Sequence, residues 1–329
     1  MRYYIRIRRC FALFGLLVFA MPCAVLGVTS ARSQPSRMMK VVVPFPPGGG
    51  VDIVARIITD QISRSQKVTF VVENRPGAGT LIATEAVSRM PADANTFLWV
   101  SNSFIINPAL RKVAYDALTS FAPACLLTRS PNVVVVNAAS PYQTLADYLK
   151  DARSKPGQLQ MAFQGPATSQ HIATEKLKRA ANVDLINVPY PGGAPAATAL
   201  TGGHVTALFV NYPSIVGQVS AGKARVLASG TRSRLEMHPN VPTIAEVVGT
   251  NYEEDVWIGA VAPANAPASS VDQMNDWMRA ALSTQEVRSK FAAQGLDAAG
   301  NCGADFGGFL REQLTEYTRV VTDAKIRED

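Results

Sequence analysis

Short runs of apolar, mostly β-branched residues alternate with amphipathic segments along the chain from residue 40 onward. Residues 40–45, 69–73 and 96–101 are predicted strands, and residues 52–63 and 80–90 are predicted helices between them. In the first of these helices, Val54, Ile57, Ile58 and Ile62 fall on one face. This alternation is typical of parallel sheets covered by helices and predicts an α/β fold.

A second set of elements follows. Thr144 and Asp147 have capping-box spacing at the start of a helix. Predicted strands cover residues 132–136, 159–163, 184–188, 205–210, 225–228 and 256–262; predicted helices cover residues 169–181, 194–201, 270–282, 286–294 and 304–324. No Pro/Ser-rich linker separates the two sets. We therefore expect two α/β lobes joined by hinge strands, with a cleft between them: residues 32–130 and 251–329 in one lobe, and residues 131–250 in the other.

The N-terminus has the pattern of a signal peptide. Four arginines lie in the first ten residues, residues 11–26 carry no charge, and Thr29 and Ala31 suit positions −3 and −1 of a cleavage site. The apolar run contains Pro22 and is shorter than the roughly 20 residues of a membrane-spanning helix, which argues against a retained anchor. We expect residues 1–31 to be removed near Ala31 and the mature protein to be periplasmic.

Composition narrows the classes of function. Without the four N-terminal arginines, the chain has 28 basic and 25 acidic residues, so the formal charge falls from +7 to +3. This balance gives no indication of nucleic-acid binding. Cys125 and Cys302 remain in the mature chain, in a compartment that permits disulfides. Cys125 lies in an apolar run and is interpreted as a small buried residue; whether the two cysteines bond stays open.

Glycine-rich loops lie between predicted strands and helices. The first, residues 44–52, reads Pro-Phe-Pro-Pro-Gly-Gly-Gly-Val-Asp. Glycines let a ligand approach the backbone, and the N–H groups of a helix start favour an anion. The loop has neither the Rossmann nor the Walker A spacing. A plain tight turn is the alternative, and for Asp52 we prefer a helix-capping role.

Similar junctions occur at residues 74–80, 101–103, 164–171 and 189–195. The alternative at residues 74–80 is an ordinary turn, at residues 101–103 hydrogen bonding of the side chains to their own backbone, and at residues 189–195 simple packing of Tyr190. His171 is interpreted as a histidine on a helix face. The candidate ligand-binding residues are Phe45, Pro47, Gly48, Gly49, Asp52, Ser101, Asn102, Ser103, Gln164, Gly165, Thr168, Ser169, His171, Tyr190, Gly192 and Asn211.

Motifs for catalysis are weak. His171, His204 and His238 show no metal-ligand spacing, and no Gly-x-Ser-x-Gly elbow occurs. Ser169 and His171 are two residues apart and would diverge on a helix. We expect no enzyme activity, no metal and no cofactor. An exported hydrolase using Ser169 or Ser101 is the alternative from another class.

Read in order, several stretches resemble the Bug family, the extracytoplasmic receptors of tripartite tricarboxylate transporters. They are residues 43–52, 72–79, 106–110, 131–133, 155–157, 188–190, 192–195 and 241–243. The resemblance implies a type II periplasmic binding-protein fold with two Venus-flytrap lobes. It also implies a monomer that binds a small carboxylate and delivers it to permease subunits; a receptor that feeds a sensor kinase is a variant of this hypothesis.

In the family, loops matching those after Val43 and before His171 hold the carboxylate, partly through backbone N–H groups and bridging water. This chain departs from the pattern in three places. Pro166 lies in the loop before His171 and removes one N–H donor. Pro191 replaces a common lysine, and Ala94 replaces the usual glycine before the third strand. These departures bear on the identity of the ligand more than on the fold.

Overall fold

The computed structural model describes residues 37–91, 93–323 and 326. The expected signal peptide, with its cleavage site near Ala31, lies outside the described residues. From Arg37 onward the chain forms one unit. Within the described residues, no helix is long and apolar enough to cross a membrane.

The sheet of the first lobe begins with three parallel strands. The strand β1 (Met38–Val43) lies between β2 (Thr69–Asn74) and β3 (Thr96–Ser101). Two antiparallel strands extend it: β9 (Asp255–Pro263) pairs with β3, and β4 (Phe121–Asn137) pairs with β9. The three parallel strands agree with the sequence prediction to within two residues at each end.

Helices cover both faces of this sheet, which is why β1 is apolar on both sides. Val41 and Val43 pack into one core cluster with α1 (Gly50–Gln66) and α9 (Ala268–Ser283), whereas Val42 packs into another with α3 (Ser103–Leu110) and α11 (Ala304–Asp323). A buried strand of continuous β-branched residues is typical of parallel sheets. The helical elements of this lobe are α1 (Gly50–Gln66), η1 (Ala78–Thr80), α2 (Leu81–Ser88), α3 (Ser103–Leu110), α9 (Ala268–Ser283), α10 (Gln285–Ala292) and α11 (Ala304–Asp323).

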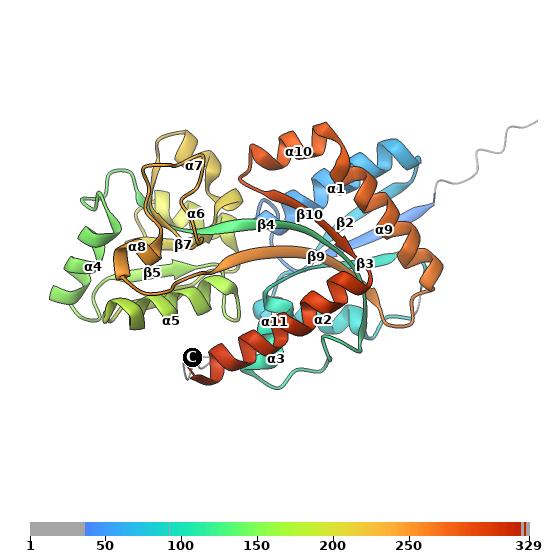
Figure 1. Cartoon of the computed structure of the whole chain (residues 1–329), viewed down its shortest axis with the longest axis horizontal. Coiled ribbons are helices and arrows are strands. Elements are labelled where there is room, and N and C mark those ends of the chain that lie inside the picture. Colours follow the sequence, from blue (N-terminus) through green and yellow to red (C-terminus); the bar gives the residue numbers. More distant parts are fainter. Residues whose placement is uncertain (1–36, 92, 324–325, 327–329) are drawn as a thin grey trace, which may run out of the picture. The chain divides into compact units, whose positions relative to one another are not determined.

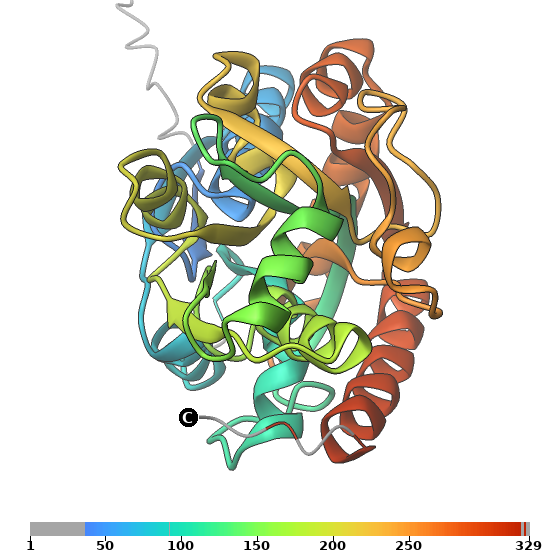
Figure 2. The same cartoon turned by 90° about the vertical axis from the view of Figure 1, so that its left-hand side faces the viewer.

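The second lobe has its own sheet. The end of β4 pairs with β7 (Ala207–Asn211) and β8 (Ala224–Ser229), and β7 continues through β5 (Gln160–Phe163) to β6 (Ile186–Pro189). Its helical elements are α4 (Leu145–Ser154), α5 (Ser169–Ala181), α6 (Gly193–Thr201), η2 (Tyr212–Ser214), α7 (Val216–Ser220) and α8 (Ile244–Val248). Thr144 and Asp147 form the predicted capping box of α4. Figure 2 shows α4 and α5 in green on this lobe.

The strand β4 runs through both sheets, beside β9 (Figure 1). Its pairing with β9 ends at Pro131, and its pairing with β7 begins at Asn132. The prediction of lobes joined by strands is confirmed, but the predicted strand at residues 132–136 covered only the end of β4. Pro131 and the polar residues before it obscured the rest, because proline is rare inside strands. The exact lobe boundaries stay a prediction.

A buried carboxyl lies beside this hinge. Glu254, the residue before β9, accepts a hydrogen bond from Tyr317 on α11 at 2.6 Å and pairs with Lys176 on α5 at 3.0 Å. Burial raises the pKa of Glu254, and Lys176 and Tyr317 oppose that effect without cancelling it. One side chain thus connects helices of both lobes.

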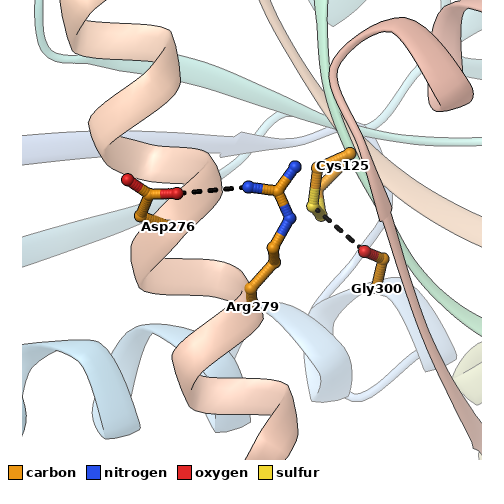
Figure 3. The surroundings of a disulfide bond; sticks show 5 residues. Cys125, Asp276, Arg279 and Gly300 are labelled. Atoms are coloured by element: carbon orange, nitrogen blue, oxygen red, sulfur yellow. Dashed lines mark hydrogen bonds and ion pairs between the residues drawn. A yellow bond between two sulfur atoms is a disulfide. The ribbon is translucent and has the colours of Figure 1, made fainter.

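Two elements of the first lobe were absent from the sequence prediction. The strand β10 (Asp297–Cys302) has few β-branched residues, but it pairs with β4 and is bonded to it by a disulfide between Cys125 and Cys302 (Figure 3). The interpretation of Cys125 as buried is correct, and the disulfide decides the question left open. The helix α3 was missed because the residues between 103 and 110 include Pro108, which breaks a helical pattern.

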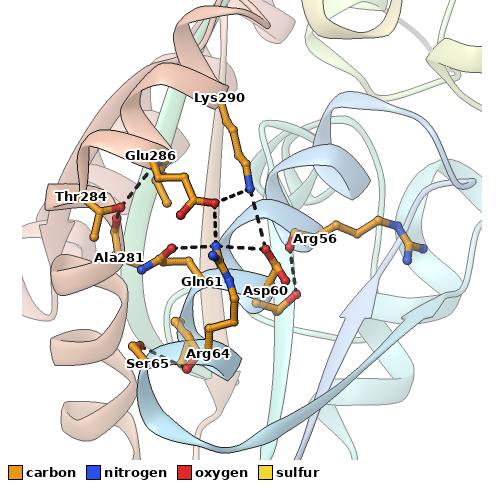
Figure 4. A network of polar contacts seen from close by, with 12 residues as sticks. Arg56, Asp60, Gln61, Arg64, Ser65, Ala281, Thr284, Glu286 and Lys290 are labelled. Carbon is orange, nitrogen blue, oxygen red and sulfur yellow. Dashed lines mark hydrogen bonds and ion pairs between the residues drawn. The ribbon is translucent and has the colours of Figure 1, made fainter.

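Ion pairs join the end of α1 to α10 (Figure 4). Arg64 lies 2.7 Å from Glu286, which also pairs with Lys290 at 2.8 Å, and Lys290 lies 3.7 Å from Asp60. The hydrogen bonds from Arg64 and Lys290 lower the pKa of Glu286 to about 2. These side chains are exposed to solvent, so the network contributes little to the stability of the fold.

Candidate functional site

The loop between β1 and α1 is shaped from within by Asp52. Gly49 is the N-cap residue of α1, and Asp52 lies in the first turn. The carboxylate of Asp52 accepts hydrogen bonds from Gly48 N–H, Arg56 Nε and Asn74 Nδ2, each at 2.9 Å. Burial alone would raise the pKa of Asp52, but these hydrogen bonds outweigh it and lower the pKa. Asp52 therefore holds the loop in shape, in keeping with the capping role preferred for it.

The start of α1 contacts the second lobe directly. Gly50 N–H donates to Ser214 Oγ at 3.1 Å. A Cβ atom at Gly50 would lie 2.3 Å from Asn211 Oδ1, closer than such atoms approach. Glycine is therefore required here because the end of β7 packs against the backbone of the helix.

A second helix starts beside the first. At the N-cap of α6, a Cβ atom on Gly192 would lie 2.7 Å from Pro46, and one on Gly193 would lie 2.4 Å from Ser214 Oγ. Both glycines thus let α6 approach the β1–α1 loop and η2 closely. Two helix N-termini, one from each lobe, converge on the same space.

A small pocket of about 10 Å³, with room for a single water-sized group, lies at this junction. None of the residues that line it carries a charge, and two helices present first-turn backbone there. First-turn N–H groups have no partner within their helix, and the helix dipole favours an anion. Among them, Gly50 N–H is engaged by Ser214 in this structure. The lining residues are Phe45, Gly49, Gly50, Val51, Ser101, Gln164, Gly193, Asn211 and Val256.

Five of the predicted site residues line this pocket: Phe45, Gly49, Ser101, Gln164 and Asn211. They come from four separate loops or strand ends that the fold brings together. The other candidates lie outside the lining set: Pro47, Gly48, Asp52, Asn102, Ser103, Gly165, Thr168, Ser169, His171, Tyr190 and Gly192. Contact of any of these residues with a ligand stays a prediction.

Several of the candidates outside the lining set have structural partners. Asn102 donates to Tyr317 Oη and to the Asp255 carbonyl, so both of its amide hydrogens are engaged. Thr168 caps α5 by accepting from His171 N–H at 3.2 Å. The ring of His171 stacks on Phe163, with ring centroids 5.1 Å apart. The stacked ring agrees with the helix-face interpretation of His171. Asn102 hydrogen-bonds to Tyr317 and Asp255 rather than to its own local backbone, so the alternative of bonding to its own backbone is wrong for this residue.

The contacts of Ser169 do not support the alternative of an exported hydrolase. Its Oγ accepts a hydrogen bond from Asn132 Nδ2 at 3.2 Å. An amide nitrogen is not a base, so this contact does not activate the hydroxyl as a nucleophile.

Sequence reasoning missed Val51, Gly193 and Val256 among the lining residues, and Ser214 behind them; Gly50 belongs to the glycine run whose N–H groups were expected to meet the ligand, although the candidate set omitted it. Gly50, Val51 and Gly193 lie within the two glycine-rich loops already identified, so extending the candidate set into each first helical turn would have found them. Val256 and Ser214 carry no such signal: one lies in an apolar strand, and the other meets Gly50 from 164 residues away.

The chain has two lobes joined by continuous strands and a pocket where helix N-termini from both lobes meet. These features define a solute-binding receptor of the type II periplasmic binding-protein fold. A family model described as "Tripartite tricarboxylate transporter family receptor" matches residues 54–326. The chain belongs to this family, and the resemblance to the Bug receptors is confirmed by a relative of that name.

That relative, Protein BugT from Bordetella pertussis, is 28% identical over 324 residues, which cover 97% of this chain and 99% of BugT. A solved structure of R. palustris Rpa4515 with adipate is 30% identical, has a TM-score of 0.85, and is matched over 89% of this chain and 99% of that one. MatC from Rhodopseudomonas palustris with bound malate is 27% identical, has a TM-score of 0.81, and is matched over 87% of this chain and 99% of MatC.

Proposed function

We propose that this chain is an exported, periplasmic receptor that captures a small carboxylate in the pocket and delivers it to the membrane permease of a tripartite tricarboxylate transporter. The ligand is bound and released unchanged, so the receptor is not an enzyme. One observation carries the proposal: the pocket combines two helix N-termini with lining side chains that are all uncharged.

The charge balance of the pocket favours an anion over a neutral or cationic ligand. Each helix N-terminus contributes about 0.3–1 kcal/mol to binding of an anion at an exposed end, and up to about 2 kcal/mol when partly buried. No acidic side chain lines the pocket to repel a carboxylate. Two relatives have solved structures with adipate and malate, both dicarboxylates, which supports a small organic acid as the ligand class.

Closure around the ligand follows from the contacts between the lobes. The hydrogen bond from Gly50 to Ser214 and the packing of Pro46 on Gly192 join the lobes next to the pocket. A ligand held by both lobes would stabilise the closed form, because binding to one of two states shifts the equilibrium toward it. A permease that recognises the closed form would then receive only loaded receptor.

Two measurements test this proposal. A thermal-shift screen of organic acids at fixed pH and salt should find acids that raise the melting temperature, because a ligand that binds only the folded state stabilises it. Mass spectrometry of purified protein under native and denaturing conditions should release any co-purified acid intact. Turnover of added esters or amides would contradict the proposal, as would a screen in which no carboxylate binds.

A pair of variants tests the position of the site. Gly50→Ala adds a Cβ atom that would lie 2.3 Å from Asn211 Oδ1, so the α1 start or the end of β7 must shift. We expect at least a tenfold loss of affinity, about 1.4 kcal/mol, with the protein still folded. Gly217→Ala is the matched control, since nothing lies within 4 Å of its added Cβ atom. Equal affinities of the two variants would place the ligand elsewhere.

The transport role needs a test in cells. Deleting the gene from its host should abolish accumulation of the labelled acid identified in the screen, and expression of the intact chain should restore it. Uptake that continues unchanged without the gene would contradict delivery to a permease.

A further inference from the structure

The side chain of Asn211 presents an unused hydrogen-bond acceptor at the pocket. Asn211 ends β7, lines the pocket, and is only 2% exposed. Its Oδ1 atom is buried and has no hydrogen-bond partner among the described residues. Buried polar atoms without partners are rare in proteins, and each one calls for an explanation such as a bound ligand or water.

The orientation of this amide is fixed by its other side. The Nδ2 atom donates to Ser130 Oγ and, at 3.5 Å, to the carbonyl of Pro131. A hydroxyl can donate or accept, but a carbonyl only accepts. Rotating the amide by 180° would place Oδ1 against the Pro131 carbonyl oxygen, so Nδ2 belongs on that side and Oδ1 faces Gly50.

Oδ1 therefore lies directly at the start of α1, beside the backbone that is proposed to hold a carboxylate. A Cβ atom at Gly50 would lie 2.3 Å from it. A carboxylate has acceptors only and cannot satisfy Oδ1. The same small volume thus contains donors for an anion and an acceptor that needs a donor.

This inference rests on the proposed function. We propose that the ligand carries a hydrogen-bond donor besides its carboxylate: a hydroxyl or ammonium group from which Asn211 Oδ1 accepts a hydrogen bond. The ligand class is then hydroxy acids and amino acids rather than unsubstituted acids. Sites built to bond a ligand O–H or N–H discriminate strongly against analogues that lack it, because the protein atom is then buried without a partner.

Calorimetric titration with matched acids tests this inference. Each set keeps the carbon chain and changes one substituent: succinate, malate and aspartate; glutarate, 2-hydroxyglutarate and glutamate; benzoate and 4-hydroxybenzoate. In each set that binds, we expect the best donor-bearing acid to bind at least tenfold more tightly than the unsubstituted one. Equal or tighter binding of the unsubstituted acid would overturn the inference while leaving carboxylate binding intact. Binding by no acid would overturn the proposed function as well.

Variants at position 211 assign the preference to this atom. Asn211→Ala removes the acceptor and should bring the affinities of substituted and unsubstituted acids to within about threefold of each other. Asn211→Asp retains an oxygen at this point. Its charge, and the oxygen it places toward the Pro131 carbonyl, should weaken binding of every acid, but donor-bearing acids should still bind more tightly than unsubstituted ones. Asn187→Ala is the matched control, because Asn187 Oδ1 is also buried without a partner but lies on β6, outside the pocket lining. A preference that survives in Asn211→Ala would refute the assignment.

Discussion

The disulfide between Cys125 and Cys302 should contribute a large part of the folding free energy. It joins positions 177 residues apart. In the loop-closure treatment, a cross-link over a loop of that length removes unfolded-state entropy equivalent to about 5 kcal/mol at 25 °C. Measured losses on removing native disulfides are about 2–5 kcal/mol, a large fraction of the roughly 5–15 kcal/mol that stabilises most folded proteins.

The assay is urea denaturation followed by tryptophan fluorescence on three samples: oxidised wild type, reduced wild type, and the double variant Cys125→Ala/Cys302→Ala. Both samples without the bond should lose about 2–5 kcal/mol and show a steeper denaturant dependence, because the open chain exposes more surface when unfolded. Comparing reduced wild type with the double variant separates the stability contributed by the cross-link from the stability contributed by packing of the buried sulfur atoms.

Affinity for the ligand should stay unchanged in the reduced protein, because neither cysteine lines the pocket. Identical unfolding of oxidised and reduced wild type would refute the reasoning. A loss of affinity without a loss of stability would also contradict it, since it would assign the bond to the site rather than to the fold.

Two pH experiments should give slopes of opposite sign. The hydrogen bonds to Asp52 hold its pKa below 3.8, so its ionised form stabilises the fold above that pH and the contribution is lost as the pH falls through the lowered pKa. The stability difference between wild type and Asp52→Asn should therefore shrink below pH 3.8 in urea titrations. Burial raises the pKa of Glu254 above 4.5, so the folded state retains a proton that the unfolded state releases. Wild-type stability relative to Glu254→Gln should thus fall as the pH rises from 4.5 through the raised pKa; parallel curves in either comparison would contradict these assignments.

Local signals made most of the fold predictable from sequence. The strand at residues 96–101 and the helix at residues 169–181 coincide with β3 and α5, because runs of apolar, aromatic and β-branched residues and an N-cap such as Thr168 act over a few neighbouring residues. The strand β10 was not predictable in this way. It is held by pairing with β4 and by a covalent bond to a distant cysteine, and neither interaction leaves a local pattern.

The sequence predicted which backbone segments form the candidate site, but not how the side chains around them would pair. Glycine-rich helix starts indicated donors for an anion, and Gly49 does line the pocket. The sequence could not show that Ser214 would meet Gly50, or that Asn211 would leave one amide atom unpaired, because these facts depend on how the two lobes pack. Long-range placement, rather than local propensity, decides the polar detail of the pocket.

The central claim is that backbone amides at the helix starts hold the ligand. Selective labelling with 15N-glycine makes these amides visible one by one in an NMR titration with an acid found in the thermal-shift screen. The amides of Gly49, Gly50 and Gly193 should shift on binding, whereas those of Gly217 and Gly222, which have open space around them, should not. Saturable binding that leaves the three pocket glycines unmoved would contradict the account.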